Sequence, residues 1–166
     1  EKGFEVVPPL LSPFFLQEFV NAIAQKQMGL KSSKVPDFVL KSIYHLIWRR
    51  QKKMNVLASR FRYYRPFTNI FKEAEEARNV VSFAAQFGEG WLLPSEIIGM
   101  VKQGVNNVAS LQPFGCIANH IVSKGIEKKL KKMFPQLNLV SLDFDSGVSS
   151  VNVTNRLLLF LDSIAV

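Results

Sequence analysis

The residues best suited to carry chemistry in this sequence lie in two short segments, 112–120 and 143–149. The first contains Cys116, the only cysteine of the chain, with His120 four residues later. Free backbone amides and the dipole at a helix N-terminus lower the pKa of a thiol and so favour the thiolate. A thiolate is both a nucleophile and a metal ligand, and a histidine one turn further along lies on the same face of a helix. Cys116 and His120 are therefore candidate metal ligands, and His120 is also a candidate base.

Each segment also has a purely structural interpretation. Cys116 fits a small buried residue at a tight turn, and His120 fits an ordinary position on an amphipathic helix, since two side chains alone do not hold a metal. In the second segment, Asp145-Ser-Gly-Val-Ser149 resembles the phosphate-binding turn of the actin and sugar-kinase ATPases. That turn joins two strands, however, whereas a helix pattern follows here. A helix N-cap with acidic residues near the positive end of the dipole explains the same residues.

The order of apolar patterns predicts how the two segments are positioned. A short run rich in β-formers at 105–111 precedes Cys116, helical spacing of apolar residues follows over 117–134, and a second strand pattern covers 137–144. Parallel strands joined by a helix end at the same edge of their sheet, where ligands of open α/β sheets bind. We therefore expect a cofactor at this edge to be contacted by Gln112, Gly115, Asn119, Lys124, Asp143, Asp145 and Ser146.

The rest of the sequence predicts a helix-rich α/β fold. A further strand is expected at 4–7, and helices are expected at 13–28, 36–60, 66–84, 94–102 and after Gly147. The sum is a small parallel sheet of about three strands with about six helices, in a single domain covering 1–166. Because Lys2-Gly3 has the pattern of a helix end with no helix before it, we expect the chain to be a fragment of a longer polypeptide.

Composition and motifs exclude several classes of protein. With 166 residues, of which 48% are hydrophobic and 20% charged, the chain is long enough and apolar enough to form a core. No apolar run reaches the ~18 residues of a transmembrane helix, and no signal-peptide pattern opens the chain, so we expect a cytoplasmic protein without a membrane partner. One cysteine allows neither an internal disulfide nor a structural zinc site of three or four cysteines. The motifs of P-loop nucleotide binding, of hydrolase nucleophile elbows and of zinc proteases are missing from the sequence.

The net charge of +8 is concentrated in one stretch and in the helix expected at 117–134. The stretch, which we call the basic arm, lies in a helical basic insertion expected at about 31–65 and consists of Arg49, Arg50, Lys52, Lys53, Arg60, Arg62 and Arg65. Basic residues beside aromatic ones are used in single-stranded nucleic acid binding. No nucleic-acid motif occurs, so nucleic acid is not expected as a partner, and an exposed surface that docks on acidic protein is favoured.

Three ordered motifs in the C-terminal half resemble the large activase-related proteins of the 2-hydroxyacyl-CoA dehydratase superfamily. They are the segment 87–96, the segment 112–120 with Gly125, and the segment 143–147 with Asn152, Asn155 and Arg156. The segment 1–7, with Pro8 and Pro9, resembles the Gly-Phe-Glu-Val-Val-Pro strand of the same family, whereas 31–65 matches no family motif. Ala118 and Val148 depart from the family pattern, in which Pro and Ala are expected at these positions.

The resemblance implies a Rossmann-like, dehydratase-type domain within an activator of 2-hydroxyglutaryl-CoA dehydratase, whose separate ATPase domains drive electrons toward an iron–sulfur cluster in anaerobic metabolism. In dehydratase subunits, cysteines from several loops hold a 4Fe–4S cluster, and Cys116 would be one such ligand. The fragment alone is expected to hold no cluster and to be inactive. Its partners would be the remaining domains of the parent polypeptide or a dehydratase component.

Two other functions fit the same residues. The chain could be an interaction module, which docks on acidic partner domains through its basic surface and in which Cys116 is structural. Alternatively, Lys124 and the basic arm could bind an anionic cofactor such as coenzyme A (CoA) at the edge of the sheet.

Overall fold

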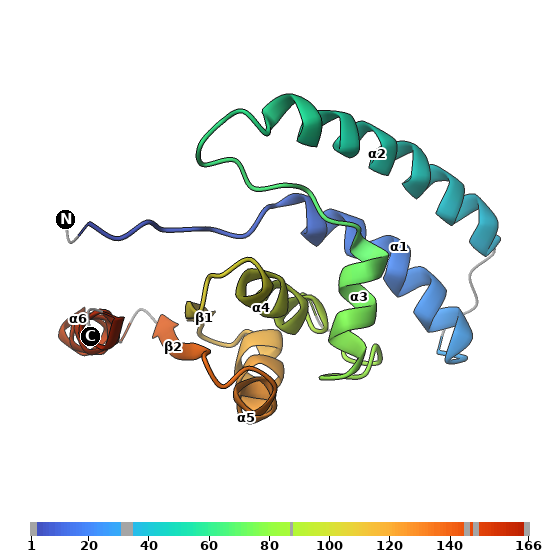
Figure 1. The fold of residues 1–166 in the computed structure, drawn as a ribbon. Coiled ribbons are helices and arrows are strands. Elements are labelled where there is room, and N and C mark those ends of the chain that lie inside the picture. Colours follow the sequence, from blue (N-terminus) through green and yellow to red (C-terminus); the bar gives the residue numbers. More distant parts are fainter. Residues whose placement is uncertain (1–2, 31–34, 87, 145–146, 148–149, 165–166) are drawn as a thin grey trace. The chain divides into compact units, whose positions relative to one another are not determined.

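A computed structural model describes residues 3–30, 35–86, 88–144, 147 and 150–164. In chain order the elements are α1 (Ser12–Gln27), α2 (Asp37–Ala58), α3 (Ile70–Arg78), α4 (Leu92–Lys102), β1 (Asn107–Pro113), the π-helical turn η1 (Ala118–Ser123), α5 (Lys124–Met133), β2 (Asn138–Phe144) and α6 (Ser150–Ile164) (Figure 1). The chain divides into two compact units, Glu1–Ala74 and Glu75–Val166. The fold class is α/β, as the sequence predicts.

The first unit is helical, and Tyr44 lies at the centre of its packing. This side chain of α2 is 4% exposed, and its ring lies 5.9 Å from that of Phe19 in α1 and 4.9 Å from that of Phe71 in α3. The backbone N–H of Ile70 donates a hydrogen bond to the Tyr44 hydroxyl at 2.9 Å. Burial raises the pKa of Tyr44, and the Ile70 hydrogen bond partly opposes this effect. Tyr44 therefore joins all three helices of the unit.

The second unit contains the sheet and the candidate site. Strands β1 and β2 pair in parallel, with Val108 opposite Leu139 and Gln112 opposite Asp143. Because side chains alternate across a strand, both pairs point to one face, which is covered by η1 and α5. On the other face α6 packs against β2, where Leu142 and Phe160 are buried. The main core of this unit consists of Val80, Ile97, Ile98, Val101, Val108, Val122, Ile126, Leu130, Leu137 and Leu139.

The expected parallel pairing of 105–111 with 137–144 is confirmed, but the expected third strand is not formed. Residues 3–10 have no regular secondary structure, and the Val6 side chain is 84% exposed. A strand needs a neighbour to satisfy its backbone N–H and C=O groups, and an alternating apolar pattern does not supply one. The sheet of the described residues has two strands.

The helix expected at 66–84 is also shorter than its pattern. It begins after Asn69, whose side-chain oxygen accepts hydrogen bonds from the N–H groups of Phe71 and Lys72, as an N-cap does. It ends at Arg78, where the N–H of Val80 donates to the carbonyl of Ala77 and closes a tighter turn. The other expected helices are present, with ends that differ by a few residues.

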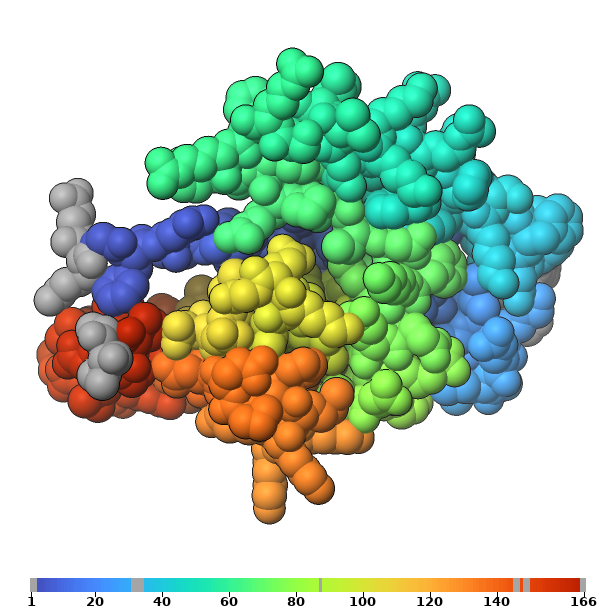
Figure 2. All heavy atoms as spheres, viewed as in Figure 1, coloured from blue at the N-terminus to red at the C-terminus, as the bar shows by residue number. Residues whose placement is uncertain are grey.

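The basic arm is exposed, as expected. Six of its seven side chains are exposed, and the seventh, Arg65, is partly buried and forms an ion pair with Glu5 at 3.4 Å. Figure 2 shows the side chains of α2 projecting outward from the surface. Among the described residues, no helix has the length and apolar character needed to cross a bilayer.

Candidate functional site

The ends of β1 and β2 and the loop that contains Cys116 lie at one edge of the sheet. The N–H of Phe114 donates to the carbonyl of Phe144 at 2.8 Å, which continues the strand pairing into the loop. Gly115 has a φ of +77°, a conformation that favours glycine and turns the chain back. The N–H of Cys116 then donates to the carbonyl of Pro113 at 3.1 Å. A tight turn therefore places Cys116 at the carboxyl edge of the sheet, immediately before the helix.

The Cys116 side chain is partly exposed, and its pKa is lowered. The largest cause is a hydrogen bond from the backbone N–H of Asn119, followed by one from the Asn119 side-chain amide, whose Nδ2 lies 3.1 Å from Sγ. The backbone N–H of Ala118 also stabilises the thiolate, while desolvation and the Glu89 carboxylate oppose the shift. The thiol is thus partly accessible, and its lowered pKa favours the thiolate form that acts as nucleophile or metal ligand.

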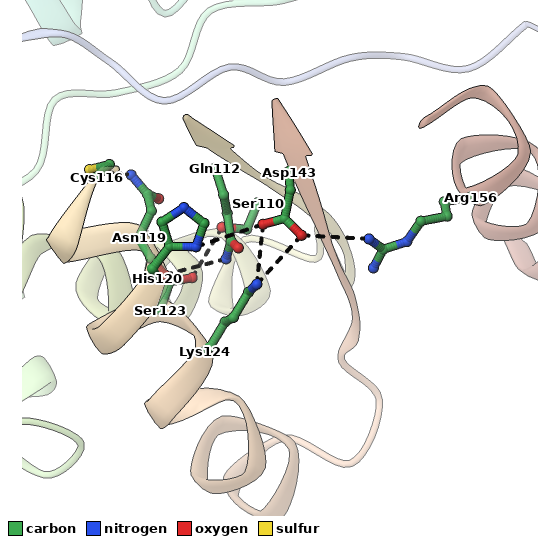
Figure 3. A network of polar contacts seen from close by, with 9 residues as sticks. All are labelled: Ser110, Gln112, Cys116, Asn119, His120, Ser123, Lys124, Asp143 and Arg156. Atoms are coloured by element: carbon green, nitrogen blue, oxygen red, sulfur yellow. Dashed lines mark hydrogen bonds and ion pairs between the residues drawn. The ribbon is translucent and has the colours of Figure 1, made fainter. Parts of the chain in front are cut away.

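The helix after Cys116 begins with a π-helical turn, η1, before it continues as α5. This wider turn changes which side chains share a face, and π-helical turns occur often at functional sites. Asn119 contacts the sulfur, whereas His120 lies beside β2, with Nδ1 3.9 Å from Oδ1 of Asp143 (Figure 3). The helix was expected to run from Cys116 to about Phe134, and η1 with α5 covers Ala118 to Met133. The structure thus pairs Cys116 with Asn119 and places His120 near Asp143.

Asp143 of β2 is the centre of an ion-pair cluster that joins this strand to η1, α5 and α6. Its carboxylate lies 3.1 Å from Nζ of Lys124 in α5 and 3.8 Å from Nη1 of Arg156 in α6, in addition to its contact with His120 (Figure 3). All four side chains are about one third to two fifths exposed, so each pair contributes little to stability on its own. Among the described side chains of this edge, the Asp143 carboxylate thus faces two permanent cations, Lys124 and Arg156.

Gln112 is a buried polar residue beneath this edge. Its side chain is 0% exposed, and its Nε2 donates to the carbonyl of Asn119 at 3.4 Å. Its Oε1 has no hydrogen-bond partner among the described residues. On the same face of β1, Ser110 contacts Ser123 of η1, with 3.1 Å between the two hydroxyl oxygens. These polar contacts hold η1 against β1 and thereby fix the position of Asn119 beside the sulfur.

The structure brings most of the predicted site residues to one edge. Cys116 and Asn119 form one pair, and His120, Lys124 and Asp143 form the ion-pair cluster. Gln112 is buried beside them and donates to the carbonyl of Asn119. Gly115 forms the turn between β1 and Cys116. Asp145 and Ser146 lie outside the described residues.

Three residues of the site were not among the predicted ones: Ser110, Ser123 and Arg156. Arg156 lies in one of the segments on which the sequence resemblance rests, but it was not itself predicted to belong to the site. The serine pair has no sequence signal beyond small polar residues at otherwise apolar positions.

The donor set fits one ligand of a metal centre rather than a complete one. Among the described residues, no group of three or more His, Cys, Asp or Glu side chains could hold a metal ion. The partly exposed thiol of Cys116 suits a single thiolate donor, and further ligands would have to come from elsewhere. Comparison of the chain with models of protein families, with curated proteins and with solved structures identified no match.

Proposed function

We propose that this chain is a dehydratase-like, cytoplasmic module of an activator of 2-hydroxyglutaryl-CoA dehydratase, in which Cys116 donates one thiolate to an iron–sulfur cluster. The observation that carries the proposal is the environment of Cys116. The sulfur is partly exposed at the carboxyl edge of the sheet, and hydrogen bonds from Asn119 lower its pKa. A Rossmann-like sheet extended by further strands of a longer polypeptide is part of this proposal.

The apolar residues around Cys116 support a site that is covered by another segment. Phe114, Ile117 and Ile121 are 75%, 51% and 66% exposed, and Phe144 at the end of β2 is 46% exposed. A cluster of 4Fe–4S type supplies one-electron transfer, and its potential depends on burial and on hydrogen bonds to sulfur. The residues of this chain would anchor one corner of the cluster through Sγ and exclude water from that side. The hydrogen bonds from Asn119 would favour the thiolate form of Cys116 and hold the sulfur in position.

Anaerobic reconstitution of the parent polypeptide with iron and sulfide tests the proposal. The parent with Cys116 should show the brown absorbance of a cluster, and Cys116→Ser should lose that absorbance and the matching iron and sulfide. A matched control is Ser42→Ala, which removes an exposed hydroxyl of α2 that donates to the carbonyl of Phe38, and which should retain the cluster.

The isolated chain provides the complementary measurement. With one cysteine it should bind iron only at background level, because a cluster needs several thiolates. An unchanged iron content in the Cys116→Ser parent would reject the ligand role and favour a structural role for this residue.

A further inference from the structure

Helix α2 has an exposed apolar stripe that the fold of its own unit does not cover. Ile43, Leu46, Met54 and Leu57 are 47%, 59%, 50% and 75% exposed. Their spacing places them along one side of the helix, and Arg50 lies between them on the same side. The opposite side of α2 is already used, since Tyr44 and Gln51 are 4% and 7% exposed. We call the four apolar residues the α2 stripe.

The charges beside the α2 stripe all have the same sign. Arg49 and Lys53 are exposed next to Leu46 and Leu57, and every charged residue between Asp37 and Glu73 is basic. Lysine and arginine repelling one another along a helix cost stability, and an acidic partner removes this cost. The basic residues beside the stripe therefore favour an acidic partner.

The arrangement of the stripe distinguishes between possible occupants. The positions that point most directly away from the buried side of α2 are those of Arg49 and Lys53, and the stripe lies on the shoulder between them and the buried side. A bilayer would meet the charged positions before the apolar ones. A nucleic acid backbone would use the charges and leave the stripe exposed. A helix packed along the shoulder would cover the stripe and bring its own acidic flank against the basic residues.

We propose that the α2 stripe is the docking site for an acidic amphipathic helix of a partner protein. The apolar side of that helix covers Ile43, Leu46, Met54 and Leu57. Its acidic flank pairs with Arg49 and Lys53. The aliphatic stem of Arg50 packs within the contact while its guanidinium reaches the rim. The site lies wholly on the first unit and is independent of the function proposed for Cys116.

The test measures binding of synthetic helical peptides to the whole chain by fluorescence anisotropy. One peptide has leucines on one face with flanking glutamates, and its matched control has lysines in place of the glutamates. The acidic peptide should bind saturably, with an affinity that falls as salt rises, and the basic peptide should not. Leu46→Glu with Leu57→Glu should weaken binding by about tenfold or more, because both residues lie in the covered stripe. Arg49→Glu with Lys53→Glu should weaken it as well.

Two variants on the other sides of α2 serve as matched controls. Val56 is 74% exposed and lies off the stripe, so Val56→Ala, which adds no charge beside Lys53, should change the affinity by less than about twofold. Lys41 is exposed and also lies off the stripe, so Lys41→Glu should have an equally small effect. Circular dichroism should show that all variants remain helical.

The proposal would be overturned if the acidic peptide failed to bind, or if the controls weakened binding as much as the stripe variants. It would also be overturned if phosphatidylserine vesicles or an oligonucleotide bound more tightly than the peptide and lost binding through the stripe variants, since the occupant would then be a membrane or a nucleic acid.

Discussion

At the scale of single residues, Asn119 determines the chemistry of Cys116. Its backbone N–H and its side-chain amide both donate to the sulfur, and together they lower the pKa of the thiol. The sequence predicted that Cys116 lies before a helix, because the breaks at Pro113 and Gly115 are strong local signals. It did not predict Asn119 as the partner of the sulfur, because an ordinary α-helix pattern places His120, four residues after Cys116, on the same face.

We expect Asn119→Ala to shift the thiolate titration of Cys116 to higher pH. The side-chain donor is lost while the larger contribution, the backbone N–H, remains, so the shift should be partial. The rate of alkylation by iodoacetamide, measured against pH, reports the thiolate of this single cysteine. In the unchanged chain the rate should rise at a lower pH than for an ordinary thiol, and in the variant the rise should move toward the ordinary value.

His120→Ala is the matched control for this titration, because His120 lies beside Asp143. Its titration curve should coincide with that of the unchanged chain. If His120→Ala moved the curve further than Asn119→Ala, the Cys116–His120 pairing expected from the sequence would replace the one described above.

At the scale of elements, the sequence predicted which helices and strands exist better than where they end. Apolar periodicity identified β1 and β2, where it reflects which side of the strand is buried. It also identified α2 as a helix but not its buried side, since Ile43 and Leu46 are exposed while Tyr44 and Gln51 are buried. The end of α3 at Arg78 depends instead on an N-cap at Asn69 and a tight turn at Val80. The strand expected at 4–7 depended on a neighbouring strand that periodicity does not provide.

The loop before α4 depends on a glycine that a periodic pattern does not identify. A Cβ atom at Gly90 would lie 1.8 Å from the carbonyl oxygen of Ala85, which accepts a hydrogen bond from the N–H of Trp91. Gly90→Ala should therefore force the backbone apart and destabilise the second unit by about 2 kcal/mol or more, measured by urea unfolding.

Gly99→Ala is the matched control, because it should raise the stability of the second unit rather than lower it. Gly99 lies inside α4, and a Cβ there would meet nothing within 4 Å. Alanine should stabilise this helix by about 0.5–1 kcal/mol, because it has a higher helix propensity than glycine. A Gly90→Ala chain as stable as the unchanged one would contradict the close approach of Ala85.

At the scale of the whole molecule, the chain divides into two compact units. The second contains the candidate site around Cys116 and Asp143, while the first contains the whole basic arm and the α2 stripe. Composition predicted a folded, core-forming chain, and periodicity predicted the helices of both units. Neither indicates which apolar face another molecule covers, because a buried core position and a covered docking position have the same sequence pattern.

The net charge of +8 predicts how the chain interacts with nucleic acid. The exposed basic arm should bind a labelled oligonucleotide weakly, through phosphate contacts that release counterions. We expect binding at low salt that collapses at physiological salt, with no preference among sequences, because phosphate contacts carry no sequence information. Fluorescence anisotropy across a salt series measures this, and Arg60→Glu with Arg62→Glu should reduce the salt dependence along with the affinity. Tight and sequence-selective binding at physiological salt would make nucleic-acid recognition the leading function, because such selectivity requires side chains that contact the bases.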